Sequence, residues 1–189
     1  MPNLARRLPL AVLALLAGPA AAQTPRATPT PPPAADASAE PERSVAVFGD
    51  WAMRCEGRPP ARACELTQTL QNDRNQPVAL FAIGRSNRAD PLKLVVQVPL
   101  NVAFPAAPRL VLDGGNTTGS PLALAWRQCI PAGCTAQIEL RDAALLTRLR
   151  ARTAEQPGRL LFQQASGGEA ALPFSFRGLS AALDALPRD

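Results

Sequence analysis

The sequence predicts a mainly β fold, an antiparallel β-sandwich or barrel-like domain with one or two short helices in its C-terminal part. Short apolar runs bounded by Gly, Pro or Asp recur after Ser44. Four cysteines form two closely spaced pairs, which suits loops that join adjacent strands. Eight runs are candidate strands, enough for a sandwich or barrel: 45–48, 51–55, 63–70, 78–83, 92–98, 110–112, 122–126 and 135–140.

Three segments precede or make up the expected domain. Residues 1–22 have the layout of a cleaved signal peptide: Arg6 and Arg7, an apolar run, then Ala20-Ala21-Ala22. That run has about ten residues, whereas a membrane span needs roughly 20, so we expect no transmembrane segment after leader cleavage. Residues 23–43 contain six prolines and read as a disordered Pro/Ala-rich tether, acting as a spacer, a docking segment or filler. Residues 44–189 are then a single disulfide-stapled domain in the periplasm, secreted or at the outer surface.

The clearest strand is the run 92–98, because apolar and polar residues alternate along it. Lys93 and Gln97 should point away from the core. Pro91 and Pro99 bracket the run, as suits strand ends. The inward face should carry Leu92, Leu94, Val96 and Val98.

Turns and helices follow this strand. Asp113-Gly114 marks a turn, and the glycine-rich stretch 114–119 is read as a hairpin loop because it lacks the Lys of a phosphate loop. Asp142 should cap a helix that runs to about Arg152, and a last helix should begin near Ser180 and stop before Pro187. Their inner faces should carry Leu145, Leu146 and Leu149 in the first helix and Leu179, Leu183 and Leu186 in the second.

The four cysteines are interpreted as two disulfides. Three pairings are possible, and the local one, Cys55 with Cys64 and Cys129 with Cys134, closes the shortest loops. A redox-catalytic pair would have two intervening residues, whereas these pairs have eight and four. A four-thiolate zinc site would need two tight knuckles, and only the second pair has that spacing. We therefore expect no metal and no cofactor.

Composition excludes several kinds of function. The chain has no histidine, so Ser-His-Asp and Cys-His catalysis and His-ligated zinc are unavailable. Net charge is +5, and +3 without Arg6 and Arg7, and no dense basic block favours nucleic-acid binding. A hydrolase that acts on envelope polymers through Asp or Glu stays open, although the carboxylates fall on different predicted elements: Asp50, Glu56, Glu65, Asp113, Glu139 and Asp142.

The tetrapeptide Phe48-Gly49-Asp50-Trp51 stands out between the first two expected strands. Gly49 permits a bend, Asp50 can bond neighbouring backbone donors, and Trp51 offers a large apolar surface. The tetrapeptide is interpreted as a core or corner motif, with a ligand-contacting Trp51 as the alternative.

Together these pieces resemble the invasion-associated locus B family of exported Gram-negative proteins. The resemblance covers about residues 45–186, and Asn101 departs from it where Gly commonly follows Pro-Leu. It implies a β-rich periplasmic or surface-associated domain with no established catalytic residues. The resemblance is carried by Phe48-Gly49-Asp50-Trp51 followed by Cys55, by Val98-Pro99-Leu100, by the apolar run ending at Asp113, by Cys129 with Gly133-Cys134, and by Phe176-Arg177-Gly178-Leu179 followed by Ala182-Leu183.

The preferred hypothesis from sequence is a non-enzymatic binding module, not an enzyme, that engages a protein or envelope component through a sheet face or edge. The alternatives are the Asp/Glu hydrolase and an envelope-stability or assembly factor with no ligand of its own.

Overall fold

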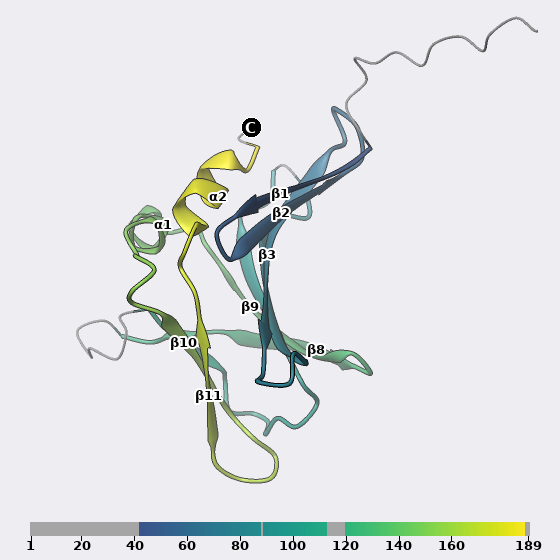
Figure 1. Ribbon diagram of the computed structural model, residues 1–189. Helices are drawn as coiled ribbons and strands as arrows, with labels where there is room; N and C mark the ends of the chain where they lie inside the picture. The colour runs from purple at the N-terminus through teal and green to yellow at the C-terminus, as the bar shows by residue number, and fades with distance from the viewer. Residues whose placement is uncertain (1–41, 88, 113–119, 188–189) are drawn as a thin grey trace, which may run out of the picture. The chain divides into compact units, whose positions relative to one another are not determined.

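The computed structural model describes residues 42–87, 89–112 and 120–187, and these form two antiparallel sheets with two short helices (Figure 1). Neither described sheet closes into a barrel, so of the two expected architectures the sandwich-like one is found. The seven-stranded sheet contains β1 (Arg43–Phe48), β2 (Trp51–Glu56), β3 (Ala63–Gln71), β4 (Pro77–Gly84), β5 (Lys93–Val98), β8 (Ala125–Ile130) and β9 (Gly133–Glu139). The four-stranded sheet contains β6 (Arg109–Val111), β7 (Leu122–Ala123), β10 (Gly158–Gln163) and β11 (Glu169–Phe174).

The order of the seven-stranded sheet follows from short connections. Its strands lie in the order β1-β2-β3-β4-β5-β9-β8, so five consecutive strands are joined as neighbours and β9 returns beside β5. The smaller sheet has the order β11-β10-β6-β7. Consecutive antiparallel neighbours need only tight turns, which the Gly and Pro punctuation of the sequence supplies.

The structure corrects three expectations about strands. The expected strand 122–126 is two strands, β7 and β8, and β8 continues to Ile130. The two strands β10 and β11 were not among the eight candidates. Since β11 contains Pro173 and alanines, which have low β propensity, its local signal is weak, and pairing with β10 decides its conformation. The expected turn at Asp113-Gly114 and the loop 114–119 lie outside the described residues, as do residues 1–41.

The core lies between the two sheets. The rings of Phe81 from β4 and Phe174 from β11 stack across it, with 4.7 Å between their centroids. Leu94, Val96 and Val98 are buried as the alternation in this run predicts, while Leu92 is half-buried because β5 begins after it, at Lys93. Few aromatic side chains contribute, so aliphatic side chains fill most of this volume.

Both expected helices are present. Helix α1 (Ala143–Arg150) is capped by Asp142, whose Oδ1 accepts a hydrogen bond of 2.8 Å from the backbone N–H of Ala144. Helix α2 (Leu179–Ala185) packs near α1 and also contacts β1 and β2. The buried helix residues are Leu145 and Leu149 in α1 and Leu179, Ala182 and Leu183 in α2.

Candidate functional site

The tetrapeptide 48–51 forms the tight turn between β1 and β2. Phe48 pairs with Trp51, which leaves Gly49 and Asp50 as a two-residue loop. Gly49 has φ of 58°, the sign that a type II′ hairpin turn requires at its first position. The sequence therefore bends here because glycine alone adopts this conformation without strain.

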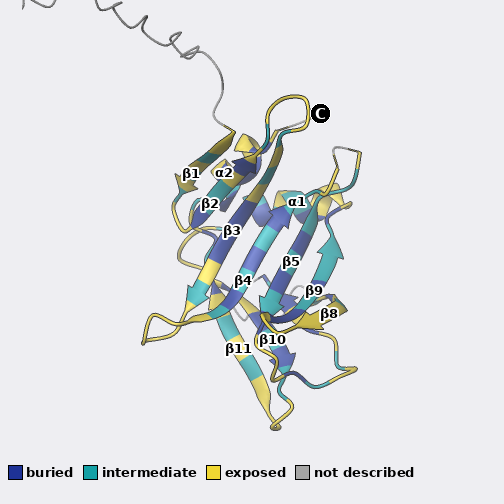
Figure 2. Ribbon diagram, turned by 90° about the vertical axis from the view of Figure 1, so that its right-hand side faces the viewer, coloured by how far each residue is buried: buried dark blue, intermediate teal, exposed yellow. Residues whose placement is uncertain are grey.

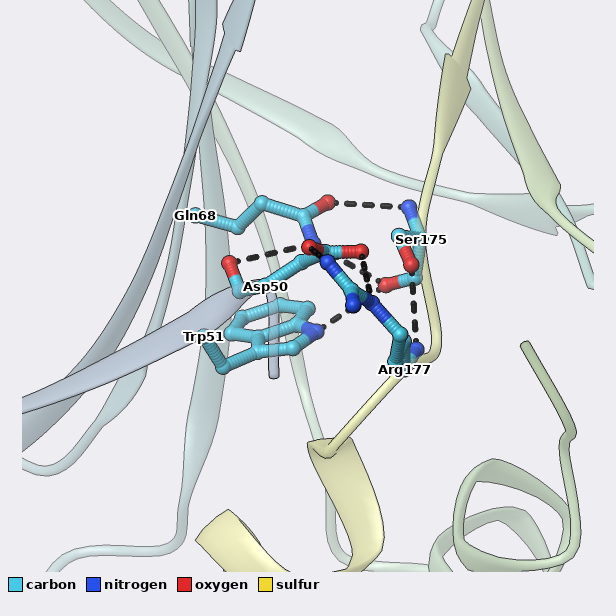
Figure 3. A network of polar contacts seen from close by, with 5 residues as sticks. All are labelled: Asp50, Trp51, Gln68, Ser175 and Arg177. Carbon is cyan, nitrogen blue, oxygen red and sulfur yellow. Dashed lines mark hydrogen bonds and ion pairs between the residues drawn. The ribbon is translucent and has the colours of Figure 1, made fainter. Parts of the chain in front are cut away.

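Trp51 is a core residue. Only 1% of its surface is exposed, and its indole N–H donates a hydrogen bond of 2.9 Å to the carbonyl of Ser175 (Figure 3). The buried Gln68 side chain joins the same strand end, donating to the Ser175 carbonyl at 3.1 Å and accepting from the Ser175 N–H at 3.0 Å. The indole ring therefore supports the packing of the segment that leads into α2.

Asp50 is held by Arg177 rather than left free for a ligand. The Arg177 guanidinium donates twice to the carboxylate, with an Nε–Oδ2 distance of 3.1 Å, and the Asp50 N–H donates to the Arg177 carbonyl at 3.0 Å. The hydrogen bond from Arg177, with a second from Ser175, lowers the pKa of Asp50 below its ordinary value. The carboxylate is therefore ionised and engaged at neutral pH.

Two glycines let the chain segments approach this closely. A Cβ on Gly178, where φ is 86°, would lie 2.0 Å from the Phe48 carbonyl oxygen. A Cβ on Gly49 would lie 2.5 Å from the Arg177 carbonyl oxygen. We call residues 48–51 together with 175–179 the latch. It joins two motifs that lie far apart in the sequence through direct contact of their backbones.

Both cysteine pairs are bonded as the local pairing predicts. Cys55 and Cys64 lie opposite each other on β2 and β3, and Cys129 and Cys134 do so on β8 and β9. The Cα–Cα distances are 4.1 and 4.0 Å. Each disulfide therefore pins the register of one hairpin of the large sheet.

The carboxylates singled out from the sequence are mostly engaged in separate places. Glu56 pairs with Arg43, Glu139 with Arg141, and Asp142 caps α1. Glu65 has its Cα partners Arg54 and Gly84 on the two neighbouring strands, and Asp113 lies outside the described residues. Among the residues that line three surface hollows in the described part of the chain, one has a carboxylate, Asp50, and this carboxylate is paired with Arg177. Residues 42–87, 89–112 and 120–187 also contain no cluster of three or more acidic, Cys or His side chains that could hold a metal ion.

The outer face of the seven-stranded sheet is the side turned away from the smaller sheet. Figure 2 shows β3, β4, β5 and β9 side by side with no helix laid over this side. The strand register places one row of mostly small or apolar residues across it, flanked on one side by a row that alternates in charge. The central row is Val47, Ala52, Thr67, Ala82, Val95 and Gln137, of which Thr67 is buried, and the flanking row contains Arg54, Glu65, Lys93 and Glu139.

A hollow of about 510 Å³ lies at one end of this outer face. Leu80 of β4 and Gln97 of β5 line it, together with Thr69, Leu100 and the β8–β9 turn at Ala132. Leu100 is a large exposed apolar side chain here. The outer face therefore combines a mixed, mostly small-residue row with a shallow, largely apolar depression.

Sequence reasoning missed several of these residues. Arg177 and Ser175 belong to the latch and Gln68 bonds to it, and the Phe176-Arg177-Gly178-Leu179 motif was the signal that could have pointed to Arg177. The outer-face residues Ala82 and Val95 carried only a weak signal, their position on the side of the strand opposite the buried residues. The described helices include none that is long and apolar enough to cross a membrane.

Comparisons with known proteins bear on the whole arrangement. The crystal structure of invasion associated protein B from Bartonella henselae is similar, with a TM-score of 0.63 and 22% sequence identity, and the match covers 75% of this chain and 92% of that chain. This likeness shows the fold. No curated protein matches the sequence. The model of the invasion associated locus B (IalB) protein family matches residues 51–187, which is most of the chain, and the chain therefore belongs to the IalB family.

Proposed function

We propose that this chain is a non-enzymatic, extracytoplasmic binding module that engages a protein or envelope component through the outer face of its seven-stranded sheet. The observation that carries the proposal is the outer face itself. It spans several strands, presents a row of mostly small or apolar side chains, and has no described helix or strand packed on it. Apolar surface left open on a folded domain is typical of an interaction site.

Family membership and the two disulfides support an extracytoplasmic address, since disulfides persist in oxidising compartments. Within that space, we propose the periplasm or the outer surface, with residues 1–22 as a cleaved leader and residues 23–43 as a tether. Mass measurement of the exported protein tests this directly. A mature N-terminus at Gln23 is expected, and an uncleaved chain would contradict the proposal.

The absence of an enzymatic role is supported by the state of the carboxylates. IalB proteins are not a known enzyme family. A two-carboxylate hydrolase needs an acid and a base facing one cleft. Asp50 is the carboxylate that lines one of the surface hollows, and it accepts hydrogen bonds from Arg177. These bonds lower the pKa of Asp50 and disfavour the protonated form that a general acid needs.

The experiment is capture from envelope extract with single-charge variants. The variants Val95→Lys and Leu80→Lys place a cation in the central row and in the hollow. The matched control is Ala171→Lys, an exposed position on β11 of the smaller sheet. We expect the wild type and Ala171→Lys to retain the same component, and both outer-face variants to lose it at least tenfold. Equal capture by all four proteins would overturn the assignment of this face.

A further inference from the structure

Three of the four strand edges in the described sheets are protected from pairing with another strand. The edge strand β11 contains Pro173, which has no N–H to donate, and β7 has only two residues. The edge strand β8 has an irregular register between Trp126 and Gln128, where the exposed Arg127 is left unpaired. Proline, shortness and bulges are the usual means by which proteins blunt sheet edges.

The fourth edge, β1, has none of these features. Its six residues pair with β2 in unbroken register, and the strand contains no proline. Val45 and Val47 are 67% and 73% exposed, although they stand mid-strand. A regular edge with exposed β-branched residues is a template for a further strand.

The backbone groups of β1 are oriented for such pairing. Phe48 and Trp51 close a two-residue hairpin, and such a closing pair exchanges backbone hydrogen bonds. Alternate residues of β1 therefore bond to β2, and the N–H and C=O groups of Val45 and Val47 face outward. The short Cα–Cα distance of the Cys55–Cys64 pair agrees, because it marks a non-hydrogen-bonded pair between β2 and β3 and so a hydrogen-bonded pair between Cys55 and Ser44.

We propose that the β1 edge binds the β1 edge of a second copy of this chain, in an antiparallel, two-fold symmetric pairing centred on Ala46. In this register Val45 of each copy lies opposite Val47 of the other, and the backbone groups that face outward meet one another. The outer faces of the two copies then join into one continuous surface. The interface is isologous, as closed dimers require.

Side-chain pairing favours this register over its neighbour. With Ala46 at the two-fold axis, both valines of each copy lie opposite valines of the other, and Arg43 lies opposite Gly49 in the turn. A shift that centres the pairing on Val45 would instead set Arg43 opposite Val47, an apolar side chain. The strand is therefore complementary to itself at its apolar centre.

We expect the dimer to be weak because its interface is small. Five residue pairs along one strand bury far less than the roughly 1,200 Å² of the smallest stable interfaces, so we expect dissociation in the range of about 10 to 500 µM. Sedimentation velocity of the oxidised full-length protein over this range should show a monomer–dimer equilibrium. A monomer at every concentration would overturn the proposal.

Variants of β1 test whether this strand forms the dimer contact. The double variant Val45→Lys/Val47→Lys brings four cations together at the two-fold axis, and Val47→Pro removes one outward-facing N–H while leaving β2 paired. Each should weaken dimerisation at least tenfold without changing the melting temperature by more than a few degrees, whereas Ala171→Lys on the protected β11 edge should have no effect. A dimer that all three variants form equally well would place the contact elsewhere. If Val47→Pro lowers stability, the double Lys variant carries the test.

The register is tested by cross-linking. Ala46→Cys should form a disulfide-linked dimer on mild oxidation, because the two copies of residue 46 face each other across the axis, whereas Ala171→Cys should not. Failure of Ala46→Cys to cross-link, with the dimer present, would exclude this register. These readouts are independent of envelope capture, so the outer-face proposal and the edge proposal can fail separately.

Discussion

The latch and the outer face lie on the same domain and differ in how their side chains are used. In the latch, Trp51, Asp50 and Arg177 all have polar partners within the chain, and the backbone of Gly178 lies against the turn between β1 and β2. On the outer face, no described helix lies over the paired strands β4 and β5 (Figure 2), on which Ala82 and Val95 are register partners. The difference teaches that the most distinctive motifs of this sequence are engaged in contacts within the chain, and that the face proposed to bind consists of ordinary strand residues.

The largest loss of stability should come from adding a side chain where the two segments of the latch approach most closely. Gly178→Ala places a methyl group 2.0 Å from the Phe48 carbonyl oxygen at a positive φ, so the free energy of unfolding should fall by about 3 kcal/mol or more, and the melting temperature by roughly 10 °C. The matched control is Gly167→Ala, whose φ of 94° is also positive but whose Cβ would meet nothing within 4 Å. Equal losses for both variants would show that backbone strain alone, and not the tight approach, explains the latch.

A smaller loss of stability is expected when the indole of Trp51 is replaced. Trp51→Phe removes the hydrogen bond to Ser175 and part of the buried ring, so we expect a loss of about 2 kcal/mol in urea unfolding. Trp126→Phe removes a hydrogen bond of the same length, 2.9 Å to Ala106, from a half-buried position, and should cost about 1 kcal/mol or less. If Trp51→Phe were instead fully stable but lost envelope capture, Trp51 would be a ligand contact and not a latch residue.

Asp50 should give a pH-dependent effect. Its pKa is lowered in the folded protein, so its ionised form stabilises the fold above the unfolded pKa, about 3.9, and this contribution is lost as the pH falls through the lower folded value. Asp50→Asn should therefore melt a few degrees below the wild type at pH 7, and the gap should close as the pH drops below about 4. A gap that stays constant to pH 2 would mean that the charge of Asp50 has no part in the latch.

The smallest effect on stability is expected on the outer face. Val95→Lys and Leu80→Lys place long side chains where solvent reaches, so the free energy of unfolding should change by about 0.5 to 1 kcal/mol at most. Urea unfolding checks this value. A loss as large as that of Gly178→Ala would indicate that the outer face is covered in the folded protein, which contradicts its role as a binding surface.

The sequence alone predicted the parts of the fold with strong local signals. The alternation in 92–98, the Asp142 cap and the two cysteine spacings all correspond to what the structure contains. Strand β11 was missed because its conformation depends on pairing with β10, which local propensity does not encode. For the site, the sequence pointed to Phe48–Trp51 but not to Arg177 as the partner of Asp50, because 127 residues separate the two side chains.

The most direct test of the account compares capture of the envelope component by folded variants of the two regions at one temperature. Asp50→Asn, which weakens the latch without unfolding it, should capture as much as the wild type, and Val95→Lys should capture at least tenfold less. Loss of capture by Asp50→Asn together with full capture by Val95→Lys would contradict the account, because the latch would then be the binding site and the outer face would not.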